Sequence, residues 1–201
     1  MAEDRGRRPG SPRTREQILE AAVAAFTSRG YAQTTIRGVA REAGVDPALV
    51  MHFFGSKDGL FATAIKESMP VGPLTEVLDD GLDGAGERLV TRYLSLWEHP
   101  EHGPRLSAVL HAAAASPAAA DLLENLVRAE LLGPLGDLIG GEHGRTRALL
   151  AGSQLLGLAM FRYVLRIDPL ASLPVPRVAA MVAPNVQRYL TGTLTAEELT
   201  R

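Results

Sequence analysis

Side chains that could do chemistry are few in this sequence, and they do not converge. There is no cysteine, which excludes disulfides, thiolate metal sites and a cysteine nucleophile. Of the five histidines, His99 and His102 lie in EHPEHG, where Pro100 and Gly103 predict a loop and the spacing matches no helical zinc motif. No serine stands in the context of a nucleophile elbow. We therefore expect no metal, no cofactor and no enzymatic activity.

Cations near the N-terminus suggest a different chemistry. Residues 1–57 hold nine Lys and Arg residues against six Asp and Glu residues, whereas the rest of the chain holds twelve against seventeen. A basic front and an acidic back favour contact of the front with a polyanion. Lys57 follows a helix-capping serine and so lies in the first turn of a helix. An ammonium is slightly unfavourable there because of the helix dipole, so the presence of a lysine suggests another role. Taken without context, Arg37 is better explained as part of a solvated helix face.

Short helices separated by turn residues must position these cations. Apolar residues recur at spacings of three and four over 18–26, which predicts a first helix that starts near residue 13 and stops at Gly30. Either Thr34 or Thr35 can cap a second helix, which ends at Gly44. We expect a tight turn at that glycine.

The third helix has the clearest start of all. Asp46 offers an N-cap oxygen, and Pro47 takes the first helical position, where its missing N–H costs nothing. The helix is about two turns long, because Gly55 breaks it after Phe54. Ser56 then caps a fourth helix.

Two short helices joined by a tight turn describe a helix-turn-helix, in which the second helix lies in the DNA major groove. That groove is about 12 Å wide and shows a distinct pattern of donors and acceptors for each base pair. Val45 and Val50 can pack inward. The outward set is then Pro47, Ala48, Leu49, Met51, His52 and Phe53.

The residues of this region match a known pattern in one uninterrupted register. They are Ile18, Leu19, Ala22, Phe26, Gly30, Tyr31, Thr34, Thr35, Ile36, Ala40, Ala43, Gly44, Val45, Pro47, Phe54, Ser56, Lys57 and Leu60. The stretch that holds them, from Arg13 to Phe61, closely resembles the N-terminal DNA-binding domain of TetR-family repressors.

The resemblance implies roles in operator binding. Thr35 would contact a phosphate at a helix N-terminus, where N–H groups favour anions. Arg37 would reach a base edge, most naturally O6 and N7 of guanine. Pro47 and Ala48 would touch thymine methyl groups or the groove wall. Phosphate contacts of this kind fix the register of the protein, and base contacts carry sequence.

Three positions depart from the family pattern or offer only apolar contact. Met51 stands where Tyr or another polar-edged residue is usual, Phe53 stands where His or Tyr is common, and Leu49 is also apolar. The first two lose a donor to phosphate, so the backbone contacts are weaker or rearranged. His52 and Lys57 would hold phosphates. The predicted DNA-binding residues are Thr35, Arg37, Pro47, Ala48, Leu49, Met51, His52, Phe53 and Lys57.

The remaining sequence predicts further helices and no strand. Ala- and Leu-rich segments with helical periodicity cover about 86–98, 104–115, 118–139, 144–167 and 175–191. The boundary between the two modules falls at Pro70, Gly72 and Pro73. We expect an all-α fold with a disordered arm (1–12), a helix-turn-helix DNA-binding domain (13–72) and a helical ligand-binding and dimerisation domain (73–201).

The C-terminal module is expected to form a homodimer and to bind a small apolar effector. TetR-like proteins pair their last two long helices in a four-helix interface, and Pro184 should kink the last one. The predicted interface residues are Leu149, Leu156, Val178, Val182, Val186, Tyr189 and Leu190. The predicted ligand residues are Leu94, Trp97, Leu110, His111, Gln154, Leu158 and Phe161, although any one of them taken singly is better explained as core.

We therefore predict a sequence-specific transcriptional regulator, a repressor that an apolar ligand releases from a pseudo-palindromic operator. There are two alternatives. The protein could be an activator, or it could be a helical ligand-binding or enzyme domain whose N-terminal module only resembles a helix-turn-helix. We expect a cytoplasmic protein, because the start lacks the apolar stretch of a secretory signal. The most apolar window, 148–161, is also shorter than the roughly 20 residues that span a bilayer.

Overall fold

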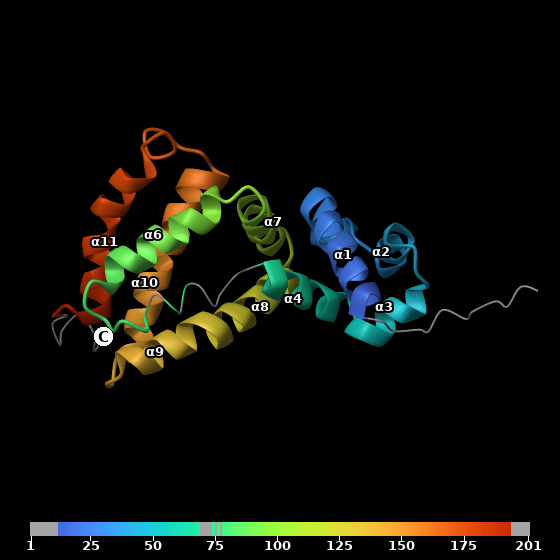
Figure 1. Ribbon diagram of the computed structural model, residues 1–201, viewed down its shortest axis with the longest axis horizontal. Coiled ribbons are helices and arrows are strands. Elements are labelled where there is room, and N and C mark those ends of the chain that lie inside the picture. Colours follow the sequence, from blue (N-terminus) through green and yellow to red (C-terminus); the bar gives the residue numbers. More distant parts are fainter. Residues whose placement is uncertain (1–11, 69–73, 75, 77, 194–201) are drawn as a thin grey trace, which may run out of the picture. The chain divides into compact units, whose positions relative to one another are not determined.

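The computed structural model describes residues 12–68, 74, 76 and 78–193. Every regular element in these residues is a helix (Figure 1), which confirms the all-α prediction. None of these helices has the combination of length and apolarity that a bilayer crossing demands. The predicted arm, except Pro12, and the predicted boundary at Pro70, Gly72 and Pro73 lie outside the described residues.

The described residues divide into two compact units. The first holds residues 12–68 and 108–123, and the second holds the described residues from 74 to 107 together with 124–193. Helices α7 (His102–Ala115) and α8 (Pro117–Val127) therefore each contribute to both units.

Four helices open the first unit: α1 (Pro12–Gln33), α2 (Ile36–Ala43), α3 (Pro47–Phe54) and α4 (Lys57–Ser68). Helix α1 packs against the other three and carries the apolar stripe that its periodicity predicts. The buried side chains that these helices share are Ile18, Leu19, Ala22, Phe26, Tyr31, Val39, Ala40, Val50, Phe54, Leu60, Phe61 and Ile65.

Gly30 interrupts α1, as the sequence predicts, but the helix does not end there. Its dihedral angles (φ 75°, ψ 172°) are open to glycine and strained for other residues, and a last helical turn then runs to Gln33. The hydroxyl of buried Thr34 donates to the carbonyls of Ala25 (3.2 Å) and Gly30 (2.8 Å). These bonds reorient the chain at the start of α2.

The second unit contains α6 (Ala85–Glu98), α9 (Gly133–Ile139), α10 (Gly144–Ala159) and α11 (Val175–Thr191). Two predicted helices each contain a π-helical turn: η1 (Arg128–Leu132) joins α8 to α9, and η2 (Met160–Val164) extends α10. At η1 the amide of Gly133 bonds to the carbonyl of Arg128, and the following Pro134 has no amide to continue an α-helical ladder.

Helices α6 and α11 pack closely at Gly86. A Cβ there would lie 2.7 Å from the carbonyl oxygen of Ala183, so only glycine allows this approach. The amide of Gly86 donates to Oε1 of Gln187 at 2.7 Å, which ties the start of α6 to α11. Helix α11 continues through Pro184 to Thr191. Its apolar stripe is therefore already packed inside the second unit.

Candidate nucleic-acid interface

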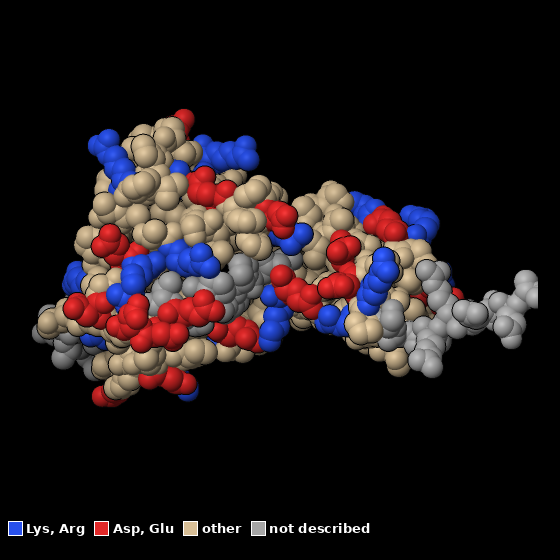
Figure 2. Space-filling view, in the orientation of Figure 1, with Lys and Arg blue, Asp and Glu red and all other residues tan. Residues whose placement is uncertain are grey.

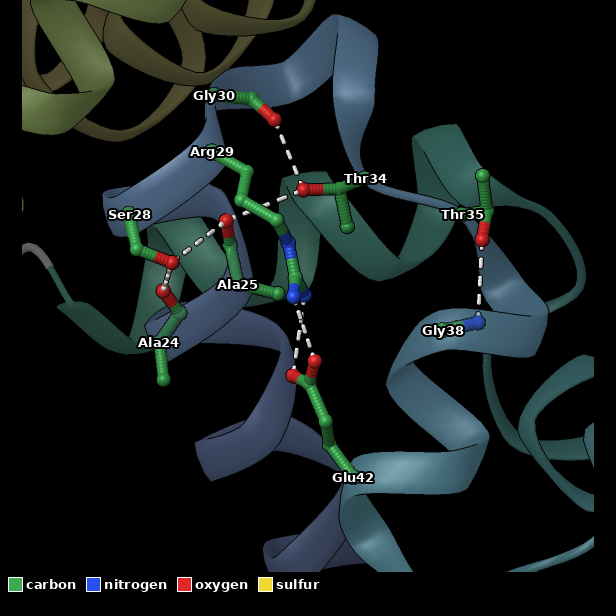
Figure 3. Close-up of polar contacts among 9 residues, drawn as sticks. All are labelled: Ala24, Ala25, Ser28, Arg29, Gly30, Thr34, Thr35, Gly38 and Glu42. Carbon is green, nitrogen blue, oxygen red and sulfur yellow. Dashed lines mark hydrogen bonds and ion pairs between the residues drawn. The ribbon is translucent and has the colours of Figure 1, made fainter.

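The start of α2 is capped by Thr35, which resolves the choice between the two threonines. Thr35 has an extended backbone (φ −125°, ψ 151°), and its Oγ1 accepts the amide of Gly38 at 3.1 Å (Figure 3). Thr34 instead points back to α1, where it braces the turn at Gly30 (Figure 3). Thr35 is exposed. Its oxygen serves as the cap acceptor, so its hydroxyl proton can still be donated outward.

The turn between α2 and α3 has the geometry that its residues predict. Gly44 adopts the left-handed conformation (φ 66°, ψ 33°), and the next amide, of Val45, returns to the carbonyl of Ala40 at 2.9 Å. Asp46 then caps α3, because its Oδ1 accepts the amide of Ala48 at 2.7 Å. Pro47 is the first residue of the helix. The two helices thus form a helix-turn-helix.

Helix α3 has one buried face and one accessible face. Val50 and Phe54 are its buried residues, and both lie against the first unit's core. On the other face Ala48 and His52 are exposed, and 44% of the surface of Met51 is exposed to solvent. The three remaining residues predicted to point outward, Pro47, Leu49 and Phe53, are half-buried.

An ion pair fixes α2 against α1. The guanidinium of Arg29 donates to both carboxylate oxygens of Glu42, at 2.6 and 3.1 Å (Figure 3). These hydrogen bonds lower the pKa of Glu42. Arg37 and Arg41 are exposed on α2, four residues apart and so on neighbouring turns. With Glu42 paired, these two arginines dominate the charge that α2 presents.

Lys57 lies at the start of α4 and contacts the last turn of α1. Its Nζ is 4.3 Å from the ring centroid of Tyr31 and donates to the carbonyl of Ala32 at 3.4 Å. Burial lowers the pKa of Lys57, and the neighbouring Asp58 opposes that shift. The hydroxyl of Tyr31 in turn donates to Asp58. Tyr31 belongs to the matched register of the sequence, and its residue type alone pointed to no role in DNA binding.

The broad charge distribution does not mark a DNA-binding face in the view shown. Acidic and basic side chains are both present on each unit in Figure 2. The candidate interface therefore depends on individual cations around α2, α3 and the start of α4.

The residues predicted to bind a ligand differ in their exposure. Two of them, Leu110 and His111, belong to the first unit, and the other five belong to the second. Buried are Leu94, Trp97 and Leu158, half-buried are Leu110 and Gln154, and exposed are His111 and Phe161.

A polar network that the sequence did not predict lies beside Trp97. The ring of Tyr163 stacks on the indole at 5.1 Å, and its hydroxyl donates to Glu98 at 2.9 Å. Burial raises the pKa of Tyr163 to about 12. Arg162 is buried and donates to the carbonyls of Leu170 (2.6 Å) and Leu173 (2.8 Å) and to Glu98. An arginine inside an apolar run was the available signal.

The residues predicted to form a dimer interface fall into two groups. Leu149 and Leu156 are each 47% exposed, and Val182 and Tyr189 are half-buried. Val178, Val186 and Leu190 are buried within the chain, on the helix that packs against α6. Those three side chains have no surface left to bury against a second copy. Helix α11 instead exposes Met181, at 63%.

His99 and His102 lie close together at the end of α6 and the start of α7. Their ring centroids are 4.3 Å apart, and burial lowers the pKa of His102. Within the described residues, no group of three or more His, Asp or Glu side chains is arranged to hold a metal ion.

Comparison with known families identifies both modules. Residues 83–190 match the family described as tetracyclin repressor-like, C-terminal domain, and residues 18–64 match that described as bacterial regulatory proteins, tetR family. The first match alone covers more than half of the chain, so the protein belongs to the TetR family. This confirms the resemblance found in the sequence.

Solved structures are similar over nearly the whole chain. A TetR-family regulator from Streptomyces coelicolor is 37% identical, covers 92% of this chain and 98% of its own, and has a TM-score of 0.67. NalD, the secondary repressor of the MexAB-OprM multidrug efflux pump in Pseudomonas aeruginosa, is 20% identical, with a TM-score of 0.68 over 90% of this chain and 97% of its own. At 20% identity, the similarity to NalD shows a shared fold only.

Curated relatives match only the front of the chain. The HTH-type transcriptional regulator BetI 2 of Chromohalobacter salexigens is 38% identical over 56 residues, which are 28% of this chain and 27% of that protein. The regulator BetI of Brucella anthropi is 38% identical over 55 residues, 27% of this chain and 28% of its own length. The match to these relatives therefore spans about a quarter of their length.

Proposed function

We propose that this protein is a transcriptional repressor that binds a pseudo-palindromic operator as a homodimer and is released by a small apolar ligand. The observation that carries the proposal is the capped helix-turn-helix, whose α3 keeps an accessible face over Ala48, Met51 and His52. Since operators are on cytoplasmic DNA, the protein would act in the cytoplasm.

Recognition would divide between base and phosphate contacts. Arg37 is exposed, and Glu42, the acidic residue on the same helix, is held by Arg29, so the guanidinium of Arg37 is available to a guanine edge. Thr35 and Lys57 would donate to phosphates on either side of α3, and His52 would add a third such contact. Pro47, Ala48, Leu49, Met51 and Phe53 would supply apolar contacts to thymine methyl groups and the groove wall.

A homodimer supplies the two-fold symmetry that a pseudo-palindrome needs. Helices α10 and α11 pack against each other, and each exposes large apolar side chains. Leu149 and Leu156 are two turns apart on one face of α10, and Met181 is exposed on α11. We propose that these three, with half-buried Val182 and Tyr189, form the interface in place of the buried stripe of α11.

The effector would bind in the second unit near Trp97. Leu94 and Leu158 offer buried apolar surface, with Gln154 and Phe161 on the same helical segment as Leu158. The indole N–H of Trp97 is buried and interacts with the hydroxyl of Tyr93 without a hydrogen bond of normal geometry, so an acceptor on the ligand would compete with that hydroxyl. Binding would favour a state with lower operator affinity, a coupling typically worth about 1–3 kcal/mol.

The test is a selection of random duplex DNA by the purified protein at two salt concentrations, with Arg37→Ala in parallel. We expect an inverted repeat for the wild type, with relaxed preference at one position of each half-site in the mutant. Arg92→Ala is the matched control, because it removes an exposed arginine from α6. It should select the same sequence as the wild type.

Three results would contradict the proposal in separate ways. Unselective binding that vanishes as salt rises would leave only the general affinity of a cationic surface for DNA. A single half-site in place of an inverted repeat would argue against the dimer. Ligand release is tested by the fluorescence of Trp97, the chain's single tryptophan. A ligand that releases the operator without changing that fluorescence would place the effector site elsewhere.

A further inference from the structure

Lys57 differs from Arg15 and Arg29, two other cations of the first unit, in what it contacts. It begins α4, where the positive end of the helix dipole disfavours an ammonium. Arg29 and Arg15 are paired with carboxylates, those of Glu42 and Glu67. Lys57 instead contacts two neutral acceptors, the ring of Tyr31 and the carbonyl of Ala32. These contacts hold the ammonium in place without cancelling its charge.

The aromatic ring beneath Lys57 is itself fixed. Tyr31 is buried in a cluster with Phe61, whose ring centroid lies 4.8 Å away, and with Phe26 at 6.1 Å. Its hydroxyl donates to the carboxylate of Asp58, the next residue after Lys57. The ring is therefore held from the core side and from the first turn of α4. Its position relative to the backbone of Lys57 is set at both ends.

The number of donors on an ammonium makes this arrangement suited to phosphate binding. A lysine carries three N–H donors. The ring face and the carbonyl of Ala32 each attract one, and a third is left for an acceptor outside the protein. A free lysine side chain loses rotamer entropy when it is immobilised. A lysine already held in the folded protein pays less of this cost when it binds.

We propose that Tyr31 and Asp58 are positioning residues, which orient the ammonium of Lys57 toward an operator phosphate before DNA arrives. This inference rests on the proposed function, since it assumes that Lys57 meets DNA. The ring would act through Lys57 alone. The contribution of Tyr31 to operator affinity should therefore disappear when the lysine is absent.

A double-mutant cycle on the selected operator tests this dependence. Lys57→Met keeps the length of the side chain and removes its charge. Because the dimer carries two copies of Lys57, the slope of log affinity against log salt should become shallower by about 1.8, or about 0.9 for each subunit. Tyr31→Leu leaves the charge but removes the ring. It should weaken binding by about three- to tenfold for each subunit, the range of one cation–π contact, with the salt slope unchanged. In the Lys57→Met background, Tyr31→Leu should change affinity by less than about twofold.

Two further variants separate positioning from damage to the core. Phe26→Leu removes a ring from the same cluster without touching Lys57, so any loss that it causes should be equal in both backgrounds. Tyr31→Phe keeps the ring and loses only the bond to Asp58. It should show a smaller loss with the same dependence on Lys57, and it covers the case in which Tyr31→Leu fails to fold.

The outcomes distinguish this inference from the function on which it rests. If Tyr31→Leu, or Tyr31→Phe in its place, costs equal affinity with and without Lys57, then Tyr31 acts only through the fold, and the positioning role is overturned. If the wild-type protein selects no operator at all, both proposals fail together. A selected operator combined with additive losses overturns only the role of Tyr31 and Asp58.

Discussion

Replacing Asp46 by alanine should loosen the helix that we expect to enter the major groove. Helix α3 is eight residues long and buries only Val50 and Phe54, so few tertiary contacts hold it. Its start depends on one side-chain bond, from the amide of Ala48 to Oδ1 of Asp46 at 2.7 Å. Loss of an N-cap costs about 1 kcal/mol, within a range of about 0.5–2 kcal/mol.

This cost corresponds to about a fivefold rise in the open population of the helix. Hydrogen exchange reports that population directly, because protection of an amide follows its local opening. The amides of residues 51–54, which can bond within α3, should exchange about fivefold faster in Asp46→Ala. Operator affinity should fall by at most the same factor for each of the two subunits, because it scales with the fraction of subunits in which α3 is formed.

Asp46→Asn is the matched control. Asparagine caps a helix about as well as aspartate, but it removes the same negative charge from beside the expected phosphates. Both variants should therefore gain the same electrostatic attraction for DNA, and the ratio of their affinities isolates the cap. Equal exchange rates for residues 51–54 in the two variants would refute the reasoning, because the cap would then contribute nothing to α3.

Three further predictions follow from contacts elsewhere. Burial raises the pKa of Tyr31 from 10.0 to about 12. The neutral hydroxyl therefore contributes stability that is complete below pH 10 and is lost as the pH rises toward about 12. In the wild type the urea midpoint of unfolding should fall over that interval, and Tyr31→Phe should make the fall smaller. Gly86→Ala should destabilise the second unit by about 1–3 kcal/mol in urea titrations, since its Cβ would lie 2.7 Å from Ala183. Gly157→Ala on α10 is the control, because no atom lies within 4 Å of the new Cβ, and it should stabilise the second unit by roughly 0.5–1 kcal/mol. A Gly86→Ala variant more stable than Gly157→Ala would be inconsistent with the packing of α6 on α11. Met181→Glu should raise the dimer dissociation constant at least tenfold in analytical ultracentrifugation, and an unchanged value would remove α11 from the interface.

Residues that act within a turn of one another were readable from the sequence. Asp46 and Pro47 predicted the start of α3, and Gly44 predicted the left-handed turn before it. In each case the donor and acceptor are two to five residues apart, so residue type and spacing nearly determine the bond. Between Thr34 and Thr35 the sequence left a choice. Only the structure resolves it, because the carbonyl of Ala25 that binds Thr34 is nine residues away.

Contacts across the fold could not be read in this way. Their spacing predicted that Val178, Val186 and Leu190 meet a second copy, whereas the structure has them buried within the chain, on the helix that packs against α6. The first-turn position of Lys57 indicated that the residue needs a special environment. That environment comes from Tyr31 and Ala32, which lie 25 or more residues earlier in the chain, in the last turn of α1. The sequence alone determined the helices, their caps and the helix-turn-helix, because local hydrogen bonds and periodicity decide these. The tertiary structure decided which faces are covered and which cations are paired, because those depend on side chains that only folding brings together.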